Sequence, residues 1–264
     1  MRFGACIDTL YTQLDWYDRI EAAKRDGFDA VEFWDWRSID VTRAARRARE
    51  CKILISGFNA DADYSLIDHS HEKAYLEYLG NSLDVAKALG APSVTIHSNA
   101  LGEGGIVVNH YDELSYAQKL CSMLDTLKKC VPMAEKANVI LNLEALNTHV
   151  DHVGNFLADT RTAAEICRTI NSPWLRILYD VYHMQINEGN LAGNIAAYSD
   201  VMGHVHIADN PGRHEPGTGE INYPFVINCL KKSGYGGIVG CELMPSGDNE
   251  AAIEAIMRVK SSVK

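Results

Sequence analysis

Long apolar segments are missing from this sequence. No window approaches the roughly 18 consecutive apolar residues that a membrane-spanning helix requires. The first ten residues, MRFGACIDTL, lack the charged stretch followed by an apolar stretch that marks a secretory signal peptide. Asn-x-Ser/Thr glycosylation motifs are also missing. We therefore expect a cytoplasmic protein that has no contact with a membrane.

Paired cysteine motifs are missing too. The chain has seven cysteines, scattered along its length and never spaced as Cys-x-x-Cys. Several of them, such as Cys241 in IVGCEL, lie in apolar runs. This pattern predicts buried reduced thiols rather than a disulfide framework or a cysteine-bound metal.

Several common catalytic and nucleotide-binding motifs are not found. There is no P-loop, no G-x-S-x-G turn and no H-E-x-x-H helix. The turn after the first predicted strand reads CIDTLY and lacks the glycine pattern of a dinucleotide-binding fold. The motif search therefore gives no support to an NTPase, an α/β-hydrolase or a dinucleotide-binding enzyme.

Positive charge is in deficit. Twenty-five Lys and Arg residues against thirty-five Asp and Glu residues give a net charge of −10 at pH 7. That balance repels nucleic acid and anionic lipid, so neither is an expected partner. A small ligand fits better, because one arginine or a bound metal can reverse the field inside a cleft. The 47% of hydrophobic residues is ordinary for a soluble globular protein.

The sequence does contain a regular alternation of short β-rich runs and longer helical patterns. The predicted strands, mostly apolar on both faces as buried parallel strands are, span residues 2–7, 29–34, 53–59, 93–98, 139–145, 175–180, 203–209 and 238–243. Helical spacing of apolar residues predicts helices at 13–26, 69–90, 112–137, 157–170 and 249–262. The arginine-rich stretch 43–50 has alanines on one face, so we expect a solvated helix rather than a nucleic-acid patch.

Eight such alternations without a linker or a change of composition predict an α/β fold, the (β/α)₈ TIM barrel, as one domain over residues 1–264. The competing architecture is a doubly wound open sheet. That fold usually carries a glycine-rich first turn, which is missing here. We therefore expect the barrel.

Acidic residues and a histidine stand at the ends of four consecutive predicted strands. In a barrel the carboxyl ends of the strands meet at one mouth, so these side chains are expected to converge. Burying several carboxylates together is unfavourable unless a cation neutralises them. Oxygen-rich ligation with one imidazole suits Mg²⁺ or Mn²⁺, with Co²⁺ as a further option. The predicted divalent-metal ligands are Glu144, Asp180, His206 and Glu242.

The segment 203–223 combines polar residues, several glycines and two prolines, which is typical of a loop that lets its backbone approach a ligand. Arg213 in this loop is the one guanidinium expected near the site, and it can hold a carboxylate through two parallel hydrogen bonds. An ordinary surface loop remains an equal alternative on composition alone.

Four segments carry a family resemblance. YDVYHMQ (179–185), HIADNPGRHEPGTGEINY (206–223), GCELMP (240–245) and EFWDW (32–36) resemble motifs of the hydroxypyruvate isomerase family. That family belongs to the xylose isomerase-like barrels, which also include the D-tagatose and D-psicose 3-epimerases and endonuclease IV.

The resemblance implies a metal-assisted isomerase that moves a proton next to a carbonyl, with hydroxypyruvate to tartronate semialdehyde as the type reaction. It makes Glu144 and Glu242 the acid–base pair as well as metal ligands, and it gives His183 and Arg213 contacts with the substrate. It also implies a homo-oligomer, either a dimer or a tetramer.

The alternatives differ in substrate. His206 matches the ketose 3-epimerases, since a glutamine can stand at this position in hydroxypyruvate isomerases, whereas the Gly219–Asn222 stretch GEIN follows the isomerase pattern. A non-catalytic sugar-acid binding protein would not need both glutamates. An endonuclease IV-like phosphodiesterase is disfavoured by the charge of −10.

Overall fold

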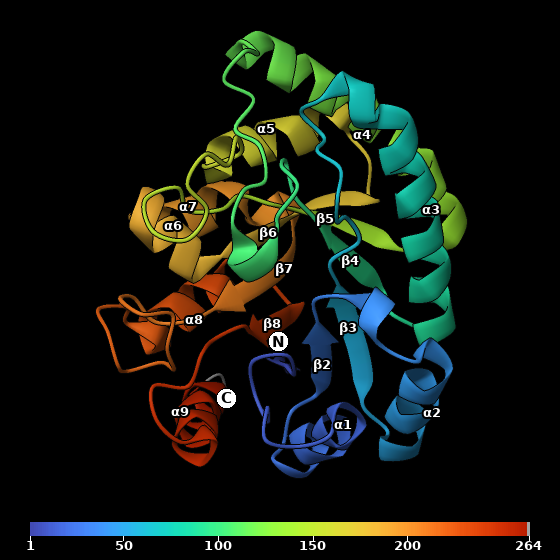
Figure 1. Ribbon diagram of the computed structural model, residues 1–264. Coiled ribbons are helices and arrows are strands. Elements are labelled where there is room, and N and C mark those ends of the chain that lie inside the picture. Colours follow the sequence, from blue (N-terminus) through green and yellow to red (C-terminus); the bar gives the residue numbers. More distant parts are fainter. Residues whose placement is uncertain (263–264) are drawn as a thin grey trace.

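A parallel sheet rolled into a nearly closed barrel forms the centre of the protein (Figure 1). The computed structural model describes residues 1–262. Neighbouring strands run in the order β3-β2-β1-β8-β7-β6-β5-β4, and every pairing is parallel. The strands are β1 (Arg2–Cys6), β2 (Ala30–Phe33), β3 (Leu54–Phe58), β4 (Ser93–Ile96), β5 (Ile140–Glu144), β6 (Leu175–Asp180), β7 (Met202–Ile207) and β8 (Ile238–Cys241).

The barrel closes between β3 and β4 just beyond the end of β3. Asn59 forms a parallel bridge with Thr95, and the Ala60 N–H donates to the Thr95 carbonyl at 2.8 Å. All eight predicted strands are present, and the predicted (β/α)₈ fold class is confirmed. Each of the first seven strands is followed by a crossover that returns outside the barrel, so the eight carboxyl ends meet at one mouth.

Helices surround the strands (Figure 1). They are α1 (Trp16–Arg25), α2 (Val41–Cys51), α3 (Glu72–Leu89), α4 (Tyr116–Ala137), α5 (Thr160–Ile170), α6 (Val181–Asn187), α7 (Leu191–Tyr198), α8 (Tyr223–Lys232) and α9 (Asn249–Ser261). The predicted ranges 13–26 and 157–170 began early, because Asp15 and Asp159 cap the first turns with their side chains. The helices α6, α7 and α8 were not predicted. The helices α6 and α7 have only seven and eight residues, which gives little periodic signal.

The arginine-rich stretch 43–50 forms most of α2. Ala44, Ala45 and Ala48 are buried, while the neighbouring arginines face outward. Arg47 pairs there with Glu21 of α1. The expected solvated helix face is confirmed.

The cysteines divide between interior and surface. Cys6, Cys130, Cys167 and Cys241 are buried, as predicted, whereas Cys121 is exposed on α4. Across residues 1–262 no helix is both long enough and apolar enough to cross a membrane.

Candidate active site

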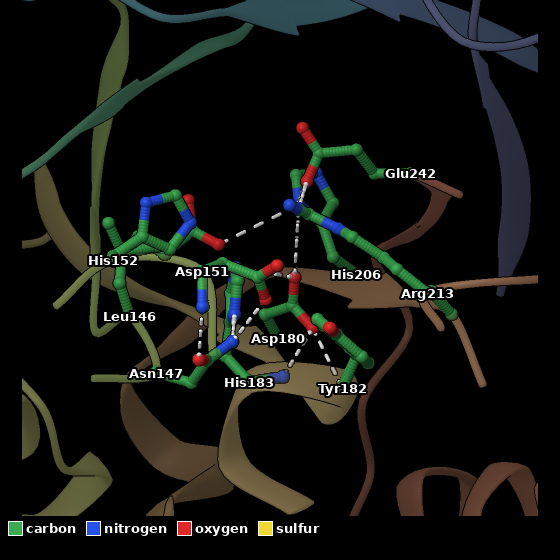
Figure 2. Close-up of polar contacts among 12 residues, drawn as sticks. Leu146, Asn147, Asp151, His152, Asp180, Tyr182, His183, His206, Arg213 and Glu242 are labelled. Atoms are coloured by element: carbon green, nitrogen blue, oxygen red, sulfur yellow. Dashed lines mark hydrogen bonds and ion pairs between the residues drawn. The ribbon is translucent and has the colours of Figure 1, made fainter. Parts of the chain in front are cut away.

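Four side chains from consecutive strands converge at the mouth of the barrel. Each offers one ligand atom, and these atoms all lie within 4.8 Å of one another. All four residues are buried. Figure 2 shows three of them around the guanidinium of Arg213. The cluster consists of Glu144 at the end of β5, Asp180 at the end of β6, His206 in β7 and Glu242 directly after β8.

Asp180 serves both the fold and the cluster. It is the N-cap of α6, and its Oδ1 accepts from the backbone N–H groups of Tyr182 at 2.8 Å and His183 at 3.2 Å. Its Oδ2 therefore remains for the site and lies 3.9 Å from His206 Nδ1. Burial raises the pKa of the Asp180 carboxyl above its usual range, although the charge of Arg213 opposes that shift.

Glu242 has a donor on each oxygen. The Trp34 indole N–H donates to Oε1, and Arg213 Nη2 donates to Oε2 at 2.5 Å. Burial alone would raise the pKa of Glu242, but the charges of Arg213 and His206 outweigh burial and lower the pKa well below its usual value. Glu242 is therefore held ionised.

Glu144 is supported differently. Its Oε2 lies 3.1 Å from Nε2 of His97, whose Nδ1 lies 3.0 Å from Oδ1 of Asp61. Burial lowers the pKa of His97, but the Asp61 and Glu144 carboxylates outweigh burial and raise it to about 10. The other oxygen of Glu144, Oε1, is buried without a hydrogen-bond partner.

His206 lies between the cluster and a second buried carboxylate. Its Nε2 is 3.2 Å from Oε1 of Glu32, and its Nδ1 points toward the cluster, 3.3 Å from Glu242 Oε2. His204 Nε2 contacts the other oxygen of Glu32 at 3.0 Å. Gly240 makes room for this carboxylate, because a Cβ there would lie 2.0 Å from Glu32 Oε1. Glu32 therefore contacts the His206 ring at Nε2, the nitrogen that does not face the cluster.

The donor set fits a hard divalent cation. Glu144 Oε1 and His206 Nδ1 are buried polar atoms without hydrogen-bond partners, and both belong to the cluster. Three carboxylates and one imidazole are the ligands that Mg²⁺ or Mn²⁺ accepts. Burial raises the pKa of Asp180, because a negative charge is unfavourable in this buried site beside other carboxylates. A bound cation would offset that cost and favour the ionised form of Asp180.

The loop between β7 and α8 is ordered by Asp209. Its carboxylate accepts from the backbone N–H groups of Gly217 at 2.8 Å and Ile221 at 3.0 Å. Gly219 must lack a side chain, because a Cβ would lie 2.1 Å from the Asn210 carbonyl oxygen. Asp209 therefore organises the loop, and it is not part of the four-residue cluster.

This loop presents Arg213 to the cluster. The residue has a left-handed backbone (φ 56°), which is uncommon for a side chain of this size, and its guanidinium lies 5.5 Å from the centre of the Tyr182 ring. The expected place of Arg213 at the site matches the structure. A second guanidinium, that of Arg37, lines the adjoining cavity away from the cluster. The Asp35 carboxylate beside Arg37 holds it at the cavity wall through a 2.9 Å ion pair.

The cluster opens into a cavity of about 790 Å³. His183 lines it with a fully buried ring, and burial lowers the pKa of this histidine well below its usual value. His152 and Asp151 line the same cavity. All of the residues predicted for metal, acid–base and substrate contacts thus lie in one place, and their chemical roles remain predictions.

Sequence reasoning missed most of the residues that support the cluster. Glu32 and Trp34 lie in EFWDW, a segment that was singled out by resemblance without a role for either residue. His97 is the last residue but one of the predicted strand 93–98, so the strand-end test applied to the later strands would have found it. Asp61 follows β3 after a gap, and nothing in its spacing marks it.

Known proteins resemble this chain in both fold and sequence. The family model described as the xylose isomerase-like TIM barrel matches residues 20–261. A solved structure described as AP endonuclease, family 2, from Brucella melitensis is 25% identical, covers 98% of this chain and 99% of its own, and superposes with a TM-score of 0.87. The fold and the match define the protein as a xylose isomerase-like TIM barrel.

Two curated relatives narrow the assignment. Hydroxypyruvate isomerase from Escherichia coli K12 is 30% identical over 260 residues, which cover 96% of this chain and 97% of the relative. 2-Oxo-tetronate isomerase from Pectobacterium atrosepticum is 31% identical over 258 residues, which cover 94% of each chain. This chain belongs to the hydroxypyruvate isomerase family, and it is an isomerase.

Proposed function

We propose that the protein is a divalent-metal-assisted isomerase of small 2-keto-3-hydroxy acids, with hydroxypyruvate to tartronate semialdehyde as the reference reaction. The observation that carries the proposal is the approach of two buried glutamates to one histidine nitrogen. Glu144 and Glu242 offer oxygens 3.9 and 3.3 Å from His206 Nδ1, so both can reach a substrate held at that point. The names of the curated relatives support this class of substrate.

The reaction needs one proton to leave C3 and one to arrive at C2, while the hydroxyl proton passes from O3 to O2. Glu144 is the better-placed base, because its Oε1 is free and faces the cluster. The proton that Glu144 takes from C3 would return from Glu144 to C2. Glu242 has donors on both oxygens and is held ionised, so it suits the second transfer, in which it accepts the O3 proton and passes it to O2. Positioned acid–base groups of this kind contribute about 10²–10⁴-fold to a rate.

The proposed metal ligands are Glu144, Asp180, His206 and Glu242, and the proposed ion is Mg²⁺ or Mn²⁺, with Co²⁺ as a further option. When bound, the cation would supply positive charge beside the enediolate oxygens formed by loss of the C3 proton. The protein's own contribution is to hold the four ligands together and to keep bulk water away from them by burial.

His183 and Arg213 are proposed to contact the substrate. Arg213 is the cationic side chain closest to the cluster, with Nη2 2.5 Å from Glu242 and 3.9 Å from Asp180. A substrate carboxylate would meet its remaining N–H groups and gain a charge-assisted pair. His183 offers a ring nitrogen, Nε2, that has no hydrogen-bond partner and lies 3.6 Å from Asp180 Oδ2.

The size of the cavity favours a second candidate substrate. A volume of about 790 Å³ exceeds the need of a three-carbon acid and lies in the range of sites for larger ligands. Polar groups away from the cluster, including Arg37 and His152, could bind additional hydroxyl groups. A four-carbon 2-oxo acid, the class named by the Pectobacterium relative, is therefore a candidate beside hydroxypyruvate.

A substrate panel tests the proposal. Protein treated with chelator and then supplied with Mg²⁺ or Mn²⁺ is incubated with hydroxypyruvate, a four-carbon 2-oxo acid, tagatose and psicose, and products are followed by NMR. We expect isomerisation of at least one keto acid with kcat/KM well above that for either ketose. Efficient epimerisation of a ketose with both keto acids untouched would instead establish a ketose 3-epimerase.

A further inference from the structure

The side-chain amide of Asn147 has a fixed orientation. Its Oδ1 accepts from the backbone N–H groups of Val150 and Asp151, each at 3.0 Å. A backbone N–H can only donate, so the atom facing both of them must be the amide oxygen. The position of the amide nitrogen follows, and it points to the opposite side (Figure 2).

The Asn147 amide nitrogen faces two acceptors. Nδ2 lies 2.6 Å from Asp151 Oδ2 and 2.7 Å from His183 Nδ1. An amide NH₂ only donates, so the His183 Nδ1 that receives its hydrogen must carry a lone pair rather than a proton. In a neutral imidazole the single proton then resides on Nε2.

His183 Nε2 is the atom that the cavity can use. The ring lines the cavity and is fully buried, and Nε2 has no hydrogen-bond partner. It lies 3.6 Å from Asp180 Oδ2, beside the four-residue cluster. A buried N–H without a partner is costly, so a ligand oxygen in the cavity would satisfy it.

We propose that Asn147 is a positioning residue that holds His183 as the neutral Nε2–H tautomer, so that His183 donates a hydrogen bond to a substrate oxygen at the cluster. The tautomer follows from the hydrogen bonds of Asn147 alone. The donation to substrate rests on the proposed function.

The substitution Asn147→Asp separates the two roles of this side chain. Aspartate keeps an oxygen for the N–H groups of Val150 and Asp151, so the turn keeps its acceptor. The other oxygen replaces the NH₂ donor opposite His183 Nδ1 and therefore requires a proton on Nδ1. It also faces the Asp151 carboxylate, which would repel it.

Asp151→Asn provides the matched baseline. In the single variant D151N, the new amide oxygen at position 151 still accepts from Asn147, so His183 keeps the same hydrogen-bond partner. In the double variant N147D/D151N the new amide at 151 donates to the new carboxylate at 147. The hydrogen bond between positions 147 and 151 is kept, with donor and acceptor exchanged. Compared with D151N, the group that faces His183 Nδ1 then changes from a hydrogen-bond donor to an acceptor.

The decisive readout is the ¹⁵N NMR spectrum of the histidine rings, with His183 assigned by its loss in His183→Gln. In the wild type and in D151N we expect a protonated Nε2 and an unprotonated Nδ1. In the double variant we expect a proton on Nδ1. A wild-type His183 with its proton on Nδ1 would overturn the proposal whether or not the Asn147 and Asp151 variants fold.

Turnover of the keto acid substrate tests the donation. Relative to D151N, the double variant should lose at least about tenfold in kcat/KM, the worth of one hydrogen bond. Unchanged turnover together with an altered tautomer would overturn the donation to substrate. If even the wild type isomerises no keto acid, the proposed function fails, and the NMR spectrum still decides the tautomer.

Discussion

Arg213 donates a hydrogen bond to Oε2 of Glu242, the same oxygen that lies 3.3 Å from His206 Nδ1 in the cluster. The guanidinium therefore already neutralises part of the negative charge gathered at the barrel mouth. A divalent cation and a substrate carboxylate would each act on this pair, the cation through Glu242 and the carboxylate through Arg213. This link between the two residues gives the first prediction.

Arg213→Lys keeps the charge but loses the planar fork, so we expect KM for a keto acid to rise more than kcat falls. Arg213→Ala should cost on the order of 1.5–3 kcal/mol in kcat/KM, the usual worth of a hydrogen bond to a charged group. Steady-state kinetics on hydroxypyruvate measure both effects. A neutral ketose has no carboxylate, so on tagatose Arg213→Lys should retain a larger share of the wild-type kcat/KM than it retains on hydroxypyruvate. Equal kinetics of the two variants on hydroxypyruvate would contradict a contact between Arg213 and the substrate carboxylate.

Glu144→Gln and Glu242→Gln should each lower turnover by at least about 10²-fold at saturating metal, because each removes an acid–base group while keeping the side chain's size. Circular dichroism should show an unchanged fold. Exchange of solvent deuterium into the substrate, followed by ¹H NMR, provides a second measurement. Near-normal turnover in either variant would show that the glutamate in question is not an acid–base group and is at most a metal ligand.

The His97–Asp61 pair predicts a pH dependence of stability. The pKa of His97 is raised from its ordinary value near 6.5 to about 10 in the folded protein. The folded state therefore binds the proton more tightly, and the stabilisation is complete below about pH 6.5 and is lost as pH rises toward 10. Urea unfolding of chelator-treated protein between pH 6 and 10 should show falling stability. His97→Gln should flatten that slope, and an equal slope in both proteins would contradict the contribution of His97.

Gly219→Ala should damage the loop that carries Arg213. The new Cβ would lie 2.1 Å from the Asn210 carbonyl oxygen, which is backbone and cannot turn aside. Overpacking of this kind costs about 1–3 kcal/mol. We expect a higher KM together with a lower melting temperature, measured by kinetics and calorimetry. Gly217→Ala is not a matched control, because Gly217 has a φ of 97°. Gly236→Ala is a better control, because no atom lies within 4 Å of its Cβ position.

The sequence predicted the strands well because their apolar runs are continuous, as burial on both faces requires. It also placed Glu144, Asp180, His206 and Glu242 together, since strand ends in a barrel share one mouth. The support for these residues could not be predicted in the same way. Asp61 reaches His97 across the seam where the barrel closes, and no local pattern records that contact.

The helices show where local signals mislead. Periodic apolar residues can continue past a helix cap, so the predicted range 112–137 starts too early. The helix begins at Tyr116, because Ser115 is its N-cap and forms a capping box with Gln118. The orientation of Asn147 toward His183 likewise depends on a turn formed three and four residues later, at Val150 and Asp151. Such contacts become visible only in three dimensions.

The most direct test of the central claim is turnover of hydroxypyruvate by chelator-treated protein, followed by NMR before and after addition of Mg²⁺ or Mn²⁺. Metal assistance by the cluster predicts almost no tartronate semialdehyde without metal and full recovery with it, and Asp180→Asn should raise the metal concentration needed. Full-rate isomerisation by rigorously metal-free protein would contradict the account.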